Sequence, residues 1–177
     1  MNLFEIGILD SIQNLFRCNV LDVICPIITA LGDYGLFWII LSVVLICIKK
    51  TRKIGLLMIA ALIINLVLCN GILKHAVNRT RPYVVNPDAP LIYKRPHDSS
   101  FPSGHTSASF SCAFVLMFEK IKYWIPAIIL SAMIGFTRLY LYMHYPTDVV
   151  AGILVGLISG YLSYKLINTI YNKCMVK

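Results

Sequence analysis

The sequence predicts an all-α, polytopic membrane protein in which about six transmembrane helices form one bundle. Of its 177 residues, 58% are hydrophobic and only 14% are charged, whereas about a quarter of the residues in a soluble domain are charged. The apolar residues stand in long blocks, and the basic residues that give the chain its net charge of +8 lie between those blocks. That arrangement favours membrane topology. It argues against binding to nucleic acid, because no stacking platform or groove-binding motif accompanies the charge. The length predicts a single membrane-embedded domain over residues 1–177.

An amphipathic segment opens the chain over residues 1–17. Phe4, Ile8 and Ile12 recur at helical spacing, and Glu5 and Asp10 stand between them. This pattern is typical of a helix that lies in the membrane interface. The alternative is that these residues are the first turns of a longer spanning helix.

Two apolar runs follow, over residues 20–31 and 36–48, and the turn Gly-Asp-Tyr-Gly at residues 32–35 separates them. Each run has about 13 residues, fewer than the roughly 20 that a helix needs to cross a bilayer core of about 30 Å. We interpret them as the first two spans, each of which takes extra length from its flanks.

A third apolar run over residues 54–73 is long enough to span and ends at Lys74. Residues 75–103 then hold five of the eight prolines and break the apolar pattern. This composition predicts an irregular polar loop. Because loops of such length in a small protein are often functional, we expect residues 75–103 to form an active-site loop.

Three further helices are expected over residues 103–118, 123–142 and 146–170. Pro146 suits the first position of a helix, where its missing N–H would have no partner in any case. The last of these helices carries three glycines spaced by four, and we interpret them as a close contact with another helix. They are Gly152, Gly156 and Gly160.

Six spans would place both termini on one side of a plasma membrane. Most basic residues fall on that side, which the positive-inside rule makes cytoplasmic. They are residues 49–53, Lys120 with Lys122, and Lys165, Lys173 and Lys177. The loop 75–103 and the turn 142–147 should then face outward.

The outward-facing segments carry cations that break the positive-inside rule. A substrate-binding role would explain them, and a merely solvated loop is the alternative. They are Arg79, Arg81, Lys94 and Arg95. Four tyrosines near this face are interpreted as an interfacial aromatic belt rather than as ligand contacts. They are Tyr83, Tyr140, Tyr142 and Tyr145.

Polar residues from three segments should meet near the outer face. Lys74, Arg81 and Arg138 supply three cations. The helix that opens at Ser103 and Gly104 offers unpaired N–H groups and the positive end of its dipole. Together these features predict a site for an anion, most naturally phosphate.

Two histidines complete the predicted site. His144 with Asp148 suits a base and the group that orients it, because a carboxylate that binds one ring nitrogen leaves the other free to attack or to accept a proton. His105 lies at the helix opening, where a protonated imidazole can donate to a leaving oxygen. One neutral and one protonated histidine would divide the base and acid roles.

These residues resemble the three-part signature of the type 2 phosphatidic acid phosphatase superfamily. The three parts are Lys74-x6-Arg81-Pro82, Pro102-Ser103-Gly104-His105 and Arg138-x5-His144-x3-Asp148. The resemblance covers about residues 20–170. Thr137 stands where the family usually has Ser before the Arg, and it keeps the hydroxyl group.

The resemblance implies a role for each residue. His144 would be the nucleophile that forms a phosphohistidine, Asp148 would orient it, and His105 would protonate the leaving group. The phosphate oxygens would be held by Lys74, Arg81, Ser103, Gly104 and Arg138. The resemblance implies neither a metal nor another cofactor, and it leaves the oligomeric state open.

The implied activity is metal-independent hydrolysis of a lipid phosphate or diphosphate from the bilayer. The small architecture and an outward-facing site favour conversion of undecaprenyl diphosphate to undecaprenyl phosphate, a step of bacterial wall assembly. Phosphatidylglycerophosphate and phosphatidic acid are alternative substrates, and a lipid phosphotransferase is an alternative activity. A non-enzymatic transporter is disfavoured, because the sequence contains neither an inverted repeat nor a pair of broken helices.

Overall fold

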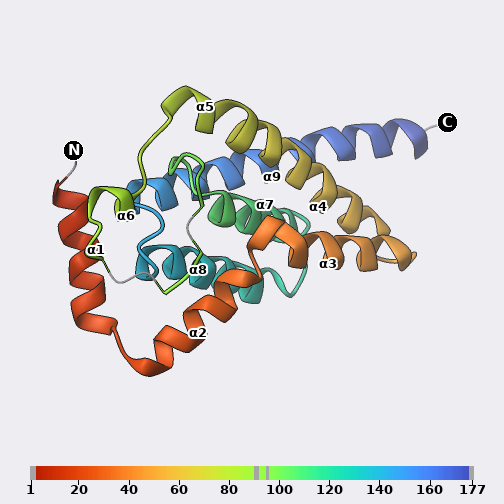
Figure 1. Cartoon of the computed structure of the whole chain (residues 1–177). Helices are drawn as coiled ribbons and strands as arrows, with labels where there is room; N and C mark the ends of the chain where they lie inside the picture. The colour runs from red at the N-terminus through yellow and green to blue at the C-terminus, as the bar shows by residue number, and fades with distance from the viewer. Residues whose placement is uncertain (1–2, 90–91, 95, 176–177) are drawn as a thin grey trace.

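The structure is a computed structural model that describes residues 3–89, 92–94 and 96–175, so Arg95 lies outside the described residues. Every regular element in these ranges is helical, which confirms the all-α prediction. The longer helices pack side by side into one elongated bundle (Figure 1). In the described part of the chain the segment 75–103 contains only two short helices, α5 (Lys74–Val77) and α6 (Pro82–Val85).

Helix α7 (Gly104–Phe118) packs in the centre of the bundle against α8 (Trp124–Tyr140) and α9 (Pro146–Met175). The glycine stripe of α9 makes this contact. A Cβ atom on Gly156 would lie 2.8 Å from the Cβ of Phe110, and one on Gly152 would lie 2.9 Å from the carbonyl oxygen of Ser103. The predicted packing role of these glycines is therefore confirmed, and Pro146 opens α9 as expected.

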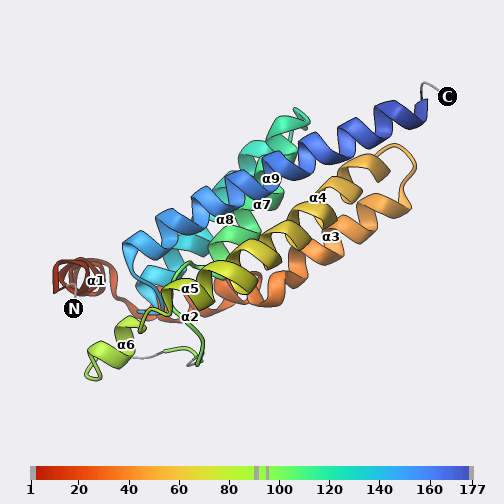
Figure 2. The ribbon, with the colours of Figure 1, turned by 90° about the horizontal axis from the view of Figure 1, so that it is seen from above.

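The two short apolar runs do not form a hairpin of two spans. They fold as α2 (Asn19–Ala30) and α3 (Leu36–Cys47), which are bent by 42° at the short helix η1 (Asp33–Gly35) and otherwise continue in one direction (Figure 2). Two helical stretches of the described chain, Arg52–Val85 and Pro146–Lys173, are long and apolar enough to cross a membrane, and the bent pair makes a third if it counts as one span. The six-span count is not confirmed.

The third predicted span forms α4 (Arg52–Asn65) and continues into the π-helical segment η2 (Leu66–Leu73). A π-helical segment inside a helix is rare and is frequently found at functional sites. Lys74 does not end this helix as expected but opens α5 directly after η2.

The termini lie at opposite ends of the bundle, not on one side as expected (Figures 1 and 2). The reason is that α2 and α3 traverse the bundle once, where the prediction had two traverses. Helix α1 (Leu3–Phe16) lies across the end where α9 begins and buries Glu5, Leu9 and Gln13, which are spaced by four. It is separated from α2 by the extended residue Cys18. The segment therefore does not continue into a longer spanning helix, and the placement of α1 in the membrane interface stays a prediction.

The tyrosines expected to form an interfacial belt are buried instead. Tyr140 and Tyr142 are fully enclosed, and Tyr83 and Tyr145 are less than a tenth exposed. The phenol of Tyr140 donates to Asp22 at 2.5 Å, and that of Tyr142 donates to Asp10 at 2.8 Å. The belt interpretation is wrong because all four rings are packed inside the protein. The hydroxyl group of Tyr83 donates to the carbonyl oxygen of Pro96.

Candidate active site

A cavity of about 740 Å³ lies between η1, α4, η2 and the N-terminal end of α7. Six of the eight predicted site residues line it, although they come from elements far apart in the sequence. They are Lys74, Arg81, Gly104, His105, Arg138 and His144. Ser103 and Asp148 do not line the cavity; both are fully buried.

His144 lies in the turn between α8 and α9 and is 1% exposed. Its Nδ1 lies 2.7 Å from the carbonyl oxygen of Ser100 and 3.5 Å from Asp148 Oδ2, while Arg81 Nη1 lies 3.3 Å from its Nε2. A carbonyl can only accept and a guanidinium can only donate. The contacts therefore assign the proton to Nδ1 and leave the lone pair on Nε2. The tautomer is that of a nucleophile, but Ser100 as well as Asp148 sets it.

The charge state of His144 agrees with this geometry. Burial lowers the pKa of its imidazole to about 3, and the cations Arg81 and Arg138 act in the same direction against the hydrogen bond with Asp148. The ring is therefore neutral near pH 7, with Nε2 unprotonated.

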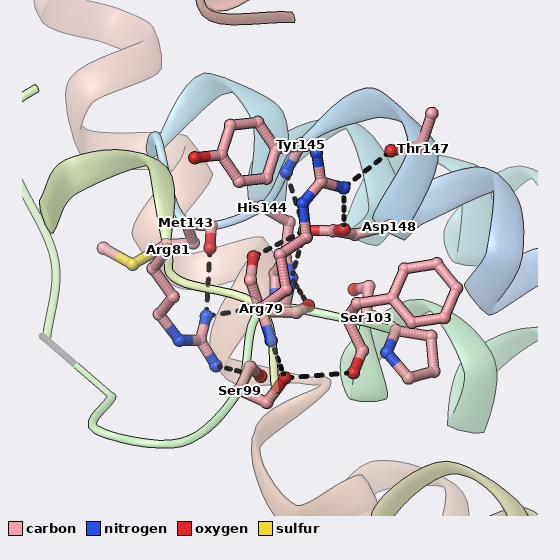
Figure 3. Close-up of polar contacts among 12 residues, drawn as sticks. Arg79, Arg81, Ser99, Ser103, Met143, His144, Tyr145, Thr147 and Asp148 are labelled. Carbon is pink, nitrogen blue, oxygen red and sulfur yellow. Dashed lines mark hydrogen bonds and ion pairs between the residues drawn. The ribbon is translucent and has the colours of Figure 1, made fainter. Parts of the chain in front are cut away.

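Asp148 is held in the first turn of α9 by donors from three directions. Ser100 Oγ donates to Oδ2 at 2.5 Å, the Tyr145 N–H donates to the same oxygen at 2.9 Å, and Arg79 Nη1 donates to Oδ1 at 2.6 Å. Figure 3 shows Arg79 beside this carboxylate, with Thr147 on the other side of the guanidinium. The carboxylate is rigidly fixed and fully enclosed.

Arg79 therefore has a structural explanation that the sequence left open. Its guanidinium also donates to Thr147 Oγ1 at 2.7 Å, forms an ion pair with Glu5 and lies over the ring of Tyr145 at 3.9 Å (Figure 3). It connects α1 to the first turn of α9. It supports Asp148 and is not among the residues that line the cavity.

Arg81 and Lys74 converge on a carboxylate that the sequence analysis missed. Arg81 Nη2 donates to Asp98 Oδ1 at 2.6 Å, and Lys74 Nζ forms an ion pair with the other oxygen. Burial opposes the ionisation of Asp98, but the hydrogen bond from Lys74 and the charges of both cations lower its pKa to about 2. An anion of the protein itself thus occupies the position where the two cations could bind phosphate.

Arg138 presents a buried donor to the cavity. Its Nη1 donates to Thr29 Oγ1 at 2.7 Å, and its Nε has no hydrogen-bond partner among the described residues. A buried guanidinium N–H without an acceptor is uncommon. A phosphate oxygen in the cavity would satisfy it.

The start of α7 closes one wall of the cavity. The Ser103 N–H donates to the Asp148 carbonyl at 3.0 Å, and its hydroxyl group lies 2.9 Å from that of Thr106. The hydroxyl of Ser103 is therefore used within α7 and does not line the cavity. Gly104 and His105 do line it, and His105 Nε2 lies 2.8 Å from Asp33 Oδ1.

Comparison with known proteins identifies the class of this site. Residues 54–171 match the PAP2 superfamily. The chain is 32% identical over 169 residues to the undecaprenyl-diphosphatase of Sulfolobus acidocaldarius, a match that covers 93% of this chain and 81% of that protein. It is 36% identical over 135 residues to the lipid A 4'-phosphatase of Bacteroides thetaiotaomicron, which covers 70% of this chain and 60% of that protein. The chain belongs to the PAP2 superfamily.

Solved structures of similar proteins share the fold of this chain. The crystal structure of LpxE from Aquifex aeolicus superimposes with a TM-score of 0.78 at 34% identity over 90% of this chain and 93% of that one. The transmembrane PAP2-type phosphatidylglycerolphosphate phosphatase of Bacillus subtilis, at 24% identity, shares the fold with a TM-score of 0.77 over 96% of this chain and 87% of that one. The protein is therefore an integral membrane hydrolase of the lipid phosphatase class.

Proposed function

We propose that the protein hydrolyses a lipid phosphate or diphosphate through a phosphohistidine on His144. The observation that carries the proposal is the content of one cavity: Nε2 of a neutral histidine 3.3 Å from Arg81, with Lys74, Arg138 and His105 in the same walls. Phosphoryl transfer needs positioning and charge stabilisation above all. Three cations around a buried nucleophile supply both.

The reaction has two halves. His144 Nε2 attacks phosphorus, the bond to the leaving oxygen breaks, and that oxygen takes a proton from His105. Water then attacks the phosphohistidine and gives a proton back to His105, and inorganic phosphate leaves. Lys74, Arg81, Arg138 and the N-terminal end of α7 at Gly104 stabilise the phosphoryl oxygens, whereas Ser103, whose N–H and hydroxyl group are bonded within the protein, does not reach them. No step in this scheme uses a metal.

The substrate we propose is undecaprenyl diphosphate, converted to undecaprenyl phosphate. The relative from Sulfolobus acidocaldarius supports this choice, whereas relatives named for lipid A and phosphatidylglycerophosphate make those lipids the rivals. One wall of the cavity is apolar and suits a lipid of any of these classes. It consists of Ile39, Ile59, Leu62, Ile63 and Leu66.

For the membrane we propose a revised topology. The chain crosses the membrane five times, once each by the α2–α3 pair, the α4–η2 helix, α7, α8 and α9. With five crossings, the N-terminus and the site face outward and the C-terminus lies in the cytoplasm. The basic segments 49–53 and 120–122 and the end of α9 gather at the bundle end opposite α1 (Figure 1), as the positive-inside rule requires of a cytoplasmic face. Impermeant labelling of terminal tags should reach only the N-terminal tag in intact cells.

A substrate panel in one detergent tests the function. Purified protein should release phosphate from undecaprenyl diphosphate faster than from phosphatidylglycerophosphate, phosphatidic acid or lipid A, with EDTA present and with His144→Ala as the inactive control. A requirement for added metal, or full turnover by His144→Ala, would overturn the mechanism. A preference for another lipid would overturn only the substrate. Mass spectrometry of products formed with acceptor lipids present would reveal a phosphotransferase.

A further inference from the structure

The turn at residues 32–35 is more than a connection between α2 and α3. Two successive residues in it, Tyr34 (φ 54°) and Gly35 (φ 67°), adopt left-handed backbone conformations. A non-glycine residue in this conformation is uncommon and concentrates at functional sites. All four residues of the turn line the same cavity as His144.

Asp33 in this turn binds His105 directly. Its Oδ1 lies 2.8 Å from His105 Nε2, and both side chains are about a fifth to a quarter exposed. The other oxygen accepts a hydrogen bond from Tyr93 at 2.8 Å, and Lys94 Nζ lies 3.7 Å from it. Asp33 is thus fixed by residues of the loop over the cavity while it contacts the histidine at the opening of α7.

Gly32 provides the space in which His105 lies. A Cβ atom at this position would approach His105 Cδ2 to 2.7 Å and the side chain of Ile134 to 3.2 Å. The φ angle of Gly32 is −88°, which any residue can adopt. Glycine is therefore needed here for room beside the imidazole and not for backbone freedom.

We propose that Asp33 is a positioning residue for the acid–base chemistry of His105, and that the turn 32–35 is a fourth part of the active site. This inference rests on the proposed function. When the carboxylate of Asp33 accepts from Nε2–H, Nδ1 is the nitrogen that carries a proton to the leaving oxygen. As the phosphorus–oxygen bond breaks, its electron pair stays on that oxygen, which takes the Nδ1 proton. The neutral ring then accepts a proton at Nδ1 from the attacking water.

Charge is the second reason for a carboxylate at this position. His105 faces Arg138 from α8 and Lys74 from the start of α5, and both disfavour a protonated imidazole. Asp33 from η1 is the opposing anion, and Tyr93 and Lys94 hold it. Without Asp33 a protonated His105 would face these two cations without the carboxylate that contacts its Nε2.

The test compares leaving groups. A lipid monophosphate expels an alkoxide, whose oxygen needs a proton, whereas 4-nitrophenolate and the phosphate monoester released from a diphosphate leave without one. The lipid substrate of this test is therefore a monophosphate such as phosphatidic acid, and Asp33→Asn should lower its kcat by about 10²–10³-fold, within the range of general acid catalysis, with KM nearly unchanged. The same variant should lower kcat for 4-nitrophenyl phosphate less than about threefold. Asp33→Glu should recover part of the loss, and Asp88→Asn, at an exposed position of the loop 75–103, is the control.

The pH profile provides a readout that a purely structural role would not change. His105 must be protonated to donate, so loss of its counter-charge should move the alkaline limb of kcat for the lipid substrate to lower pH in Asp33→Asn. An equal loss on both substrates with an unmoved limb would overturn the inference. If Asp33→Asn does not fold, Gly32→Ala decides: it should show the same leaving-group pattern, with Gly7→Ala as control, because nothing lies within 4 Å of an added Cβ there. Full lipid turnover by Gly32→Ala would then overturn the inference.

Failure of the proposed function is distinguishable from failure of this inference. Quenched reactions of Asp33→Asn with 4-nitrophenyl phosphate should still trap phosphohistidine on residue 144. If the unmodified protein traps none on any substrate, the proposed function fails. If the unmodified protein traps it but Asp33→Asn traps none, Asp33 serves the nucleophile or the fold and the inference fails.

Discussion

The two histidine–carboxylate pairs of this molecule differ in how they are enclosed. The side chains of His144 and Asp148 are 2% and 0% exposed, and three donors from different segments fix the carboxylate. The side chains of His105 and Asp33 are 21% and 24% exposed. The difference matches the two proposed roles. A nucleophile must stay neutral and aimed at phosphorus, whereas an acid must gain and lose protons with substrate and water.

The largest expected effect separates the two histidines. His144→Ala should lower kcat by about 10⁴-fold or more on every substrate, because no other group can form the covalent intermediate. His105→Ala should lower turnover of a lipid monophosphate by about 10²–10⁴-fold and turnover of 4-nitrophenyl phosphate much less. Single-turnover kinetics with both substrates measure this split. Equal losses in the two variants on both substrates would remove the distinction between the pairs.

The sequence predicted which residues meet but not all of what holds them. Lys74, Arg138 and His144 could be expected at one depth, because each stands at the end of an apolar run whose length fixes its position along the bundle. They do line one cavity. Arg79 and Asp98 come from a loop without periodicity, and such long-range contacts leave no pattern in a single sequence. Ser100 acts on His144 through its backbone carbonyl, which no residue type encodes.

The path of the chain through the membrane was likewise only partly predictable from the sequence. The runs 20–31 and 36–48 are each too short to span, so the pattern fits either a hairpin of two spans or one broken helix. The turn 32–35 decides between them through the left-handed conformations of Tyr34 and Gly35 and a bend of 42°. A Gly-Asp-Tyr-Gly segment is compatible with both outcomes. The order and start of α7, α8 and α9 were predictable because Pro146, the polar turn at 119–122 and long apolar runs all agreed.

The next effect tests whether the buried pair of His144 and Asp148 depends on the hydrogen bond from Arg79. Arg79→Ala removes a donor from the buried carboxylate of Asp148 and the ion pair with Glu5. We expect kcat to fall about 10–100-fold on lipid and on 4-nitrophenyl phosphate alike, since the nucleophile acts on both. The melting temperature should fall as well, because α1 loses one of the polar contacts that hold it to the bundle. Arg52→Ala at the opposite bundle end is the control, and a leaving-group dependence in Arg79→Ala would assign Arg79 to the acid instead.

The burial of His144 also predicts that activity persists at unusually low pH. The pKa of His144 is lowered to about 3 by burial, below the 6.5 of an exposed histidine. Because the ring of His144 stays neutral well below pH 6.5, the kcat for 4-nitrophenyl phosphate should stay near its plateau down to about pH 5. The same lowered pKa makes the fold lose stability as pH falls from 6.5 toward 3, since the unfolded chain binds the proton first. A fall in kcat centred near pH 6.5, with a parallel fall in the phosphohistidine trapped on His144, would contradict this.

The smallest expected effect concerns Asp98. Its carboxylate forms ion pairs with both Lys74 and Arg81, so a phosphate must displace it before it binds to these cations. Asp98→Asn keeps the shape and removes the competing charge. Because the side chain is 48% exposed, solvent screens much of this interaction, and we expect KM to fall only about two- to tenfold with kcat within about twofold. Inhibition by inorganic phosphate should tighten by the same factor, with Asp88→Asn as control. A rise in KM would instead mean that Asp98 holds the two cations in place for the substrate.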